Sequence, residues 1–216
     1  MSRYTQGCED RGVQSVLAIS TDLMDQAESC DSREATGQLH GIPVLVKDNI
    51  QAIGLPGTAG SLALAGRAVV EDAELVSRLR AAGAIVMGST NLSEWANIRS
   101  GKSTSGWSAV GGLTANPWKY KHSAGGSSSG SGAAVAAGLI PFAVGTETDG
   151  SIVCPASLNG VVGIKPTVGS VSTAGVVPVS LSQDVPGPLA RSVEDAALLL
   201  EVLSGQTGLV DLCNND

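Results

Sequence analysis

Ser151, in the stretch GTETDGSIVCP at residues 145–155, is the first candidate nucleophile in this sequence. A serine hydroxyl attacks a carbonyl carbon when a neighbouring base takes its proton and when hydrogen-bond donors stabilise the resulting oxyanion. The small and acidic residues before Ser151, followed by apolar residues, predict a tight turn that leads into a helix. The rest of the sequence must then supply the base.

Lys47 is the candidate base, because it ends the apolar run IPVLV. If that run is a central strand, burial disfavours the charged ammonium and lowers the pKa of the lysine, so that a neutral amine becomes available. Two structural alternatives remain open. The lysine could extend from the strand end to solvent, or it could pair with the adjacent Asp48.

Other catalytic patterns fit the sequence less well. The stretch GSSSG at 126–130 matches the G-x-S-x-G elbow with Ser128 as nucleophile, but His40 and His122 both precede that serine, whereas the histidine follows it in hydrolases of that kind. The sequence contains no S-x-x-K motif with any of its lysines and no phosphate-binding G-x-x-x-x-G-K-[ST] loop.

The segments that must position these residues alternate between strand and helix patterns. Apolar runs predict strands at 42–46, 84–89 and 140–147, and helical periodicity or small-residue runs predict helices within 71–83, 129–139, 151–160 and 192–205. This alternation predicts an α/β fold with a mixed, largely parallel sheet flanked by helices. We expect a single domain over residues 1–216.

Composition argues against several classes of function. A net charge of -7 and only 3% aromatic residues make nucleic acid a poor partner, and no apolar segment is long enough to predict a membrane span or a secretory signal. A cytoplasmic location is therefore expected. Four scattered cysteines and two histidines predict neither a metal site nor a disulfide framework, and we expect no cofactor.

Five ordered stretches carry a resemblance to a known family. They are GIPVLVKDNI, GSTNLSEWAN, GGSSSGSGAAVAAG, GTETDGSIVCPASLNGVVGIKPT and SQDVPGPLARSVEDA. In order and spacing they resemble the amidase signature family, and TNLSEWAN and GTETDGSIVCP look most like its peptide amidase branch. The resemblance covers residues 41–205, which we take as the signature core, and leaves 206–216 as an expected irregular tail.

The resemblance implies a Ser-cisSer-Lys triad. Lys47 matches the base, Ser127 matches a bridging serine in a cis peptide bond, and Ser151 matches the nucleophile. Ser128 is implied as a supporting residue that bonds near the lysine, although a helix-capping role fits it equally well.

The resemblance also implies where the oxyanion and the substrate are held. The main-chain N–H groups of Thr148, Asp149, Gly150 and Ser151 match the oxyanion hole. The Asp149 side chain either serves turn geometry or contacts substrate. Asn91, Ser93 and Trp95 are candidates for the substrate pocket, with simple packing as the alternative for the tryptophan.

The implied activity is hydrolysis of a linear carboxamide, such as a peptide amide, to an acid and ammonia through an acyl-enzyme. Full-length members of the family are longer, so two alternatives stay open. The chain could be a truncated, non-catalytic amidase-like fragment or interaction subunit, or it could be one component of an amidotransferase. In addition, a second copy or a partner chain could cover an exposed edge of the sheet.

Overall fold

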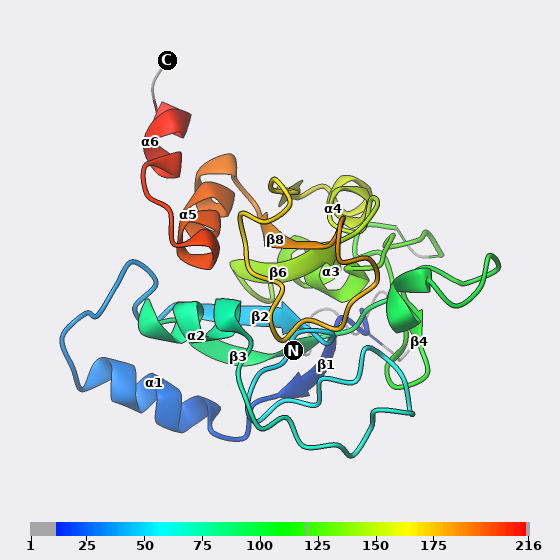
Figure 1. Ribbon diagram of the computed structural model, residues 1–216, viewed down its shortest axis with the longest axis horizontal. Helices are drawn as coiled ribbons and strands as arrows, with labels where there is room; N and C mark the ends of the chain where they lie inside the picture. Colours follow the sequence, from blue (N-terminus) through cyan, green and yellow to red (C-terminus); the bar gives the residue numbers. More distant parts are fainter. Residues whose placement is uncertain (1–11, 120, 215–216) are drawn as a thin grey trace.

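A six-stranded sheet organises the computed structural model, which describes residues 12–119 and 121–214 (Figure 1). The strand order across the sheet is β1-β3-β2-β6-β8-β7. The strands are β1 (Val16–Ile19), β2 (Pro43–Lys47), β3 (Ile85–Thr90), β6 (Phe142–Glu147), β7 (Val162–Gly163) and β8 (Val185–Ala190). Two short strands, β4 (Trp107–Ser108) and β5 (Gly112–Leu113), pair separately.

The centre of the sheet is parallel and its flanks are antiparallel. Strand β2 pairs in parallel with both β3 and β6, while β1 runs antiparallel to β3, and β8 runs antiparallel to β6 and β7. The predicted mixed α/β sheet is confirmed. Because β2 and β6 run in the same direction, their carboxyl ends at Lys47 and Glu147 lie at the same edge of the sheet.

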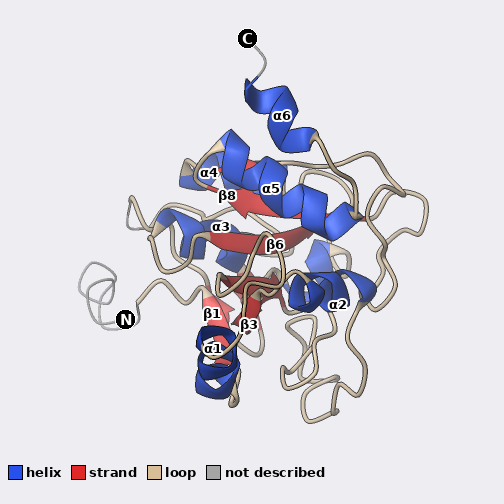
Figure 2. Ribbon diagram, turned by 90° about the vertical axis from the view of Figure 1, so that its left-hand side faces the viewer, coloured by secondary structure: helices blue, strands red, loops and turns tan. Residues whose placement is uncertain are grey.

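Helices cover both faces of the sheet (Figure 2). The α-helices are α1 (Leu23–Asp31), α2 (Glu74–Ala81), α3 (Ser129–Ala136), α4 (Val153–Asn159), α5 (Val193–Ser204) and α6 (Leu209–Asn214), with a 3₁₀ turn η2 (Glu94–Asn97). Helices α2 and α5 pack on one face together with Val44 and Val46, whereas α3 packs on the other face with Leu45.

Burial of β2 on both faces follows from this layering. Val44, Leu45 and Val46 are fully buried, and the period of two along a strand sends alternate side chains to opposite helical layers. Lys47 therefore has the same orientation as Leu45, toward the side where α3 begins. The predicted strand at 42–46 is confirmed, with observed bounds one residue later.

The end of the chain differs from the expected irregular tail, because residues 209–214 form α6. The side chain of Glu201, on α5, accepts hydrogen bonds from the main-chain N–H groups of Leu209 (2.5 Å) and Val210 (3.0 Å). A carboxylate that satisfies the first N–H groups of a short helix stabilises that helix start. The hydrophobic pattern of residues 206–216 gives no sign that Glu201, eight residues before Leu209, binds the start of this helix. The sequence pattern alone therefore does not predict α6.

Candidate active site

Lys47 is completely buried, and its side-chain nitrogen meets three oxygen atoms. Lys47 Nζ lies 2.7 Å from Ser127 Oγ, 2.9 Å from Thr146 Oγ1 and 3.2 Å from the Thr146 carbonyl oxygen. Burial lowers the pKa of Lys47 from its ordinary 10.5 to about 7, and the charges of Glu147 and Asp184 oppose that shift. A substantial fraction of neutral amine is therefore present near neutral pH.

The two structural alternatives for Lys47 are excluded by this burial and by the contacts of Asp48. The Asp48 carboxylate accepts hydrogen bonds from the N–H of Gly57 (3.1 Å) and from the N–H (2.9 Å) and hydroxyl of Thr58. Burial raises the pKa of Asp48, while these hydrogen bonds act in the opposite direction. Among the described residues, no carboxylate forms an ion pair with Lys47.

Ser127 follows a cis peptide bond after Gly126, the conformation that the resemblance implied. The serine is fully buried just before α3, and its carbonyl oxygen accepts a hydrogen bond from the N–H of Ser93 at 3.1 Å. The Ser93 hydroxyl in turn accepts from the N–H of Gly106 at 2.8 Å. Through these contacts, Ser93 helps to fix the position of Ser127, whose hydroxyl lies next to Lys47.

Ser151 lies in the turn between β6 and α4, with 9% of its surface exposed. Its carbonyl oxygen accepts a hydrogen bond from the N–H of Ser128 at 3.1 Å, which joins the Ser151 turn to the segment that carries Ser127. In the described part of the chain, Ser151 Oγ has no hydrogen-bond partner, so the structure does not connect Ser151 directly to Ser127. The contact between Lys47 and Ser127 is formed.

Ser128 is the residue immediately before α3, at the N-cap position, but its hydroxyl does not cap the helix. The hydroxyl donates to the Thr146 carbonyl oxygen at 3.1 Å and accepts from the Thr146 N–H at 3.2 Å. Lys47 Nζ contacts the same carbonyl oxygen. Ser128 thus ties the start of α3 to β6 next to the lysine, and the capping alternative is wrong.

The carboxylate of Glu147 organises the turn that holds Ser151. It accepts hydrogen bonds from the N–H groups of Gly150 (2.9 Å), Ile152 (2.6 Å) and Val153 (2.9 Å) at the start of α4. The N–H of Gly150, which is predicted to belong to the oxyanion hole, is therefore engaged by Glu147 in this structure. The N–H groups of Thr148, Asp149 and Ser151 have no acceptor within the described residues. The Asp149 side chain is exposed.

The three candidates for the substrate pocket have different environments. Asn91 is fully buried, and its amide donates to the Gln14 and Gly112 carbonyls and to Thr114 Oγ1 while it accepts from Ser108, so it holds loops together. Ser93 is buried and supports Ser127, as described above. Trp95 is half-buried in η2, where Trp95, Ala96 and Asn97 have left-handed φ values of 50°, 54° and 69°.

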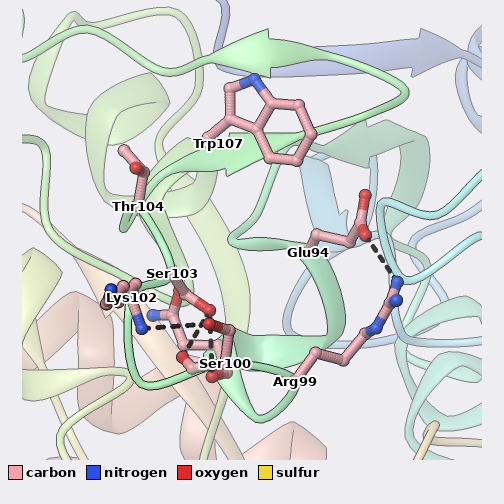
Figure 3. Close-up of a pocket in the computed structure, with 8 residues that line it drawn as sticks. Glu94, Arg99, Ser100, Lys102, Ser103, Thr104 and Trp107 are labelled. Carbon is pink, nitrogen blue, oxygen red and sulfur yellow. Dashed lines mark hydrogen bonds and ion pairs between the residues drawn. The ribbon is translucent and has the colours of Figure 1, made fainter.

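The loop that follows Trp95 forms an open cavity of about 370 Å³ (Figure 3). The cavity is lined by Glu94, Asn97, Arg99, Ser100, Lys102, Ser103, Thr104 and Trp107. Glu94 pairs with Arg99 at 3.1 Å at the rim, and Trp107 is 44% exposed beside it. Trp107, and not Trp95, is the tryptophan that this cavity presents to solvent.

Three residues next to Lys47 were missed by reasoning from the sequence alone. Thr146 lies beside the lysine at the end of β6, Asn49 donates its amide N–H to Thr146 Oγ1 at 3.0 Å, and Glu147 shapes the turn. A signal was present in the sequence, because polar residues occur at the ends of the predicted strands 42–46 and 140–147. Parallel strands bring their carboxyl ends together, so these polar residues are expected to lie near each other. Asp184 accepts hydrogen bonds from the Thr148 hydroxyl (2.5 Å) and from the N–H groups of Val179 and Ser180.

Metal-binding clusters and membrane-spanning helices do not occur in the described part of the chain. Within 12–119 and 121–214, no group of histidine, cysteine, aspartate and glutamate side chains is arranged to hold a metal ion. Across those residues, every helix is too short or too polar to span a lipid bilayer.

Known proteins resemble this chain over most of its length. The family model described as Amidase matches residues 8–210. One subunit of the glutamyl-tRNA(Gln) amidotransferase of Methanosarcina mazei is 44% identical over 204 residues, which cover 94% of this chain and 42% of that protein. A probable amidase of Arabidopsis thaliana is 48% identical over 197 residues, which cover 88% of this chain and 38% of that protein.

A solved structure extends the similarity to the fold. The X-ray structure of native peptide amidase from Stenotrophomonas maltophilia matches with a TM-score of 0.90 and 50% identity, covering 100% of this chain and 44% of that chain. The chain therefore spans about two fifths of the length of the proteins it matches.

Proposed function

The chain belongs to the amidase family, and we propose that it hydrolyses a linear carboxamide, such as the terminal amide of a peptide, to a carboxylic acid and ammonia. The observation that carries this proposal is the completely buried Lys47, whose pKa is lowered to about 7 and whose Nζ lies 2.7 Å from Ser127 Oγ. A lysine that is partly neutral at physiological pH acts as a general base toward a hydroxyl at this distance.

In the proposed reaction, Ser151 Oγ attacks the amide carbon and forms a carbon–oxygen bond. Its proton passes to Ser127 Oγ, and the Ser127 proton passes to Lys47 Nζ. The carbonyl oxygen gains the negative charge, which the N–H groups of Thr148, Asp149 and Ser151 stabilise.

Collapse of this intermediate breaks the carbon–nitrogen bond. The proton held by Lys47 returns through the Ser127 hydroxyl to the leaving nitrogen, ammonia departs, and an ester to Ser151 remains. A water molecule then attacks the ester by the same sequence of proton transfers and releases the acid. One amine thus serves as base and acid in each half of the reaction.

Ser151→Ala tests the proposal, with Ser157→Ala as the matched control because Ser157 is exposed on α4, the helix that follows Ser151. The 216-residue protein is incubated with a peptide carboxamide, and released ammonia is measured. We expect wild type and Ser157→Ala to release ammonia and Ser151→Ala to release none. Equal release by Ser151→Ala, or no release by the wild type, would contradict the proposal.

Labelling supplies a second measurement of the same assignment. A fluorophosphonate probe reacts with activated serine hydroxyls, so mass spectrometry of the labelled protein should place the adduct on Ser151. We expect Lys47→Met to abolish labelling without unfolding the chain. An adduct on another serine would move the nucleophile away from the proposed turn.

An amidotransferase role is the second candidate, because one relative of 44% identity is a component of a glutamyl-tRNA(Gln) amidotransferase. In that role the ammonia would come from glutamine and would be used by a partner protein. The 50% identity to peptide amidase over the whole chain favours free carboxamide hydrolysis. Glutamine in place of the peptide carboxamide distinguishes the two, since only the amidotransferase role predicts a preference for it.

A partner or a second copy remains part of the proposal, since β1 and β7 are the edge strands of the sheet. Unpaired edge strands present free N–H and C=O groups to other chains. The surface next to β7 also exposes Val153 (45%) and Leu158 (47%) on α4. Light scattering of the purified chain measures its mass in solution. A monomer that still releases ammonia would show that activity does not require another chain to cover the edge strands. The alternative of a non-catalytic fragment predicts no ammonia at any concentration.

A further inference from the structure

The three oxygen atoms around Lys47 Nζ pose a problem of hydrogen-bond direction. An ammonium has three N–H donors, and these match Ser127 Oγ, Thr146 Oγ1 and the Thr146 carbonyl oxygen one for one. A neutral amine has two N–H donors and one lone pair. When Lys47 loses its proton, one of the three contacts must therefore reverse, with the oxygen atom donating to nitrogen.

Only one of the possible reversals supports a proton relay. The Thr146 carbonyl oxygen has no hydrogen to donate, so the choice lies between the hydroxyls of Ser127 and Thr146. If Ser127 donates, the lone pair of Lys47 points along the path to Ser151. If Thr146 donates, its hydroxyl occupies the lone pair, and Thr146 Oγ1 has no hydrogen bond to Ser127 or Ser151 through which a proton could pass. Lys47 then donates to Ser127 and cannot accept its proton.

The side chain of Asn49 is placed to decide between these hydroxyls. Asn49 is 5% exposed, and its amide lies 3.0 Å from Thr146 Oγ1 with the nitrogen donating. In this arrangement Asn49 Oδ1 is buried without a partner among the described residues. Thr146 Oγ1 accepts from both Lys47 and Asn49, and its own hydrogen has no acceptor there.

A half-turn of the Asn49 amide would pair these two groups, because the oxygen and nitrogen of a carboxamide occupy nearly equivalent positions. The Asn49 oxygen would then accept the Thr146 hydroxyl hydrogen. The half-turn gives a partner to two groups that lack one, the Asn49 oxygen and the Thr146 hydroxyl hydrogen, in exchange for the single hydrogen bond that the Asn49 nitrogen now donates. With its single hydrogen committed to Asn49, Thr146 Oγ1 can only accept from Lys47.

We propose that Asn49 is a positioning residue for the relay: when Lys47 is uncharged, Asn49 Oδ1 accepts the Thr146 hydroxyl hydrogen, so that the Lys47 lone pair is left to Ser127. In the described part of the chain Asn49 forms no hydrogen bond with Ser151, and it acts through Thr146. This inference rests on the proposed function, since it gives the direction of proton transfer in that reaction.

A double-variant experiment separates this role from a merely structural one. Asn49→Leu frees the Thr146 hydroxyl to occupy the lone pair, and we expect kcat to fall roughly 10-fold to 100-fold with KM nearly unchanged. Thr146→Val removes the competing hydroxyl, so the double variant Asn49→Leu/Thr146→Val should recover the kcat of Thr146→Val alone. If the double variant is slower than both single variants, the losses accumulate and the inference is wrong.

Asn49→Asp supplies the conservative variant, because a carboxylate still accepts the Thr146 hydrogen. We expect the maximal kcat to stay within about threefold of wild type, while the acid limb of the pH profile moves to higher pH as the added charge joins those of Glu147 and Asp184 around Lys47. Gln51→Glu adds the same charge at an exposed position two residues away and should leave the limb in place. Loss of maximal kcat in Asn49→Asp equal to that in Asn49→Leu would overturn the inference.

A titration that needs no turnover keeps this test distinct from the test of the proposed function. With ¹³C-labelled lysine, the Cε signal of Lys47, assigned by its absence in Lys47→Met, reports the midpoint directly. We expect a higher midpoint in Asn49→Asp and no change in Gln51→Glu. An unchanged midpoint in Asn49→Asp overturns the inference whether or not ammonia is released. A wild type that titrates as expected but releases no ammonia contradicts the proposed function alone.

Discussion

The lowered pKa of Lys47 predicts that the free energy of unfolding depends on pH. Replacing Lys47 should remove this part of the pH dependence. The pKa of Lys47 is lowered from 10.5 in its ordinary state to about 7 by burial in the folded protein. Between these values the unfolded chain binds a proton that the folded chain does not. The free energy of unfolding therefore rises with pH from about 7 to 10.5. Below about pH 7 the folded protein bears the full cost of burying a charged lysine.

The size of the effect follows from the two pKa values. The difference, 10.5 minus about 7, is about 3.5 units, and at roughly 1.4 kcal/mol per unit it corresponds to a total of about 5 kcal/mol. The part that falls between about pH 7 and pH 9 is about 2 kcal/mol. Full burial of Lys47 means that solvent screening does not reduce this value much.

Urea unfolding of wild type and Lys47→Met between about pH 7 and pH 9 measures this contribution. Methionine fills a similar volume and has no charge, and any loss from leaving Ser127 and Thr146 without the amine is independent of pH. Other titrating groups contribute equally to both proteins and cancel in the difference. We expect the stability of wild type relative to Lys47→Met to rise by about 2 kcal/mol. Parallel curves for the two proteins would refute a Lys47 pKa near 7.

Three further substitutions test other parts of the structure. Glu147→Gln removes a negative charge that raises the pKa of Lys47, so the acid limb of kcat should move to lower pH, and the weaker acceptor for the α4 N–H groups should lower the maximal rate. A limb that moves to higher pH would contradict this sign. Ser192→Ala deletes the side-chain cap that accepts from the Asp195 N–H at the start of α5 and should cost about 1 kcal/mol in urea unfolding. Leu199→Ala, at a fully buried position of the same helix, should cost roughly 2 to 5 kcal/mol by the same measurement, and a smaller loss would mean that the core relaxes around the deleted atoms.

The layers of the fold were predictable because their signals are local. The buried run before Lys47 predicts a central strand, and the spacing of Leu75, Val76 and Leu79 places them on one face of α2, where all three are buried. Ser192, at the first position of the motif S-x-x-D, caps α5 as its sequence pattern indicates. Each of these features depends on residues within one or two turns of one another.

The details of the site were less predictable, because they depend on groups distant in the sequence. Asn91 carries polar groups suited to a substrate pocket, yet its partners at Gln14 and Thr114 lie 77 and 23 residues away and draw it into the interior. Gly150 fits an oxyanion hole by its place in the motif, but the path of the turn brings its N–H to Glu147. Neither outcome follows from periodicity, since both depend on where a loop folds back.

The position of the acidic groups explains how Lys47 can be buried near two carboxylates and still lose its proton near neutral pH. A direct ion pair with either acid would favour the ammonium and keep the base protonated. Instead, Glu147 is bound by three N–H groups at the start of α4, and Asp184 is bound by two N–H groups and the Thr148 hydroxyl. Both carboxylates are therefore stabilised by other hydrogen-bond donors. Their charges raise the pKa of Lys47 by less than its burial lowers it. The hydrogen bonds that shape the Ser151 turn thus also weaken the attraction between the carboxylates and the amine, which links the geometry of the proposed nucleophile to the protonation state of its proposed base.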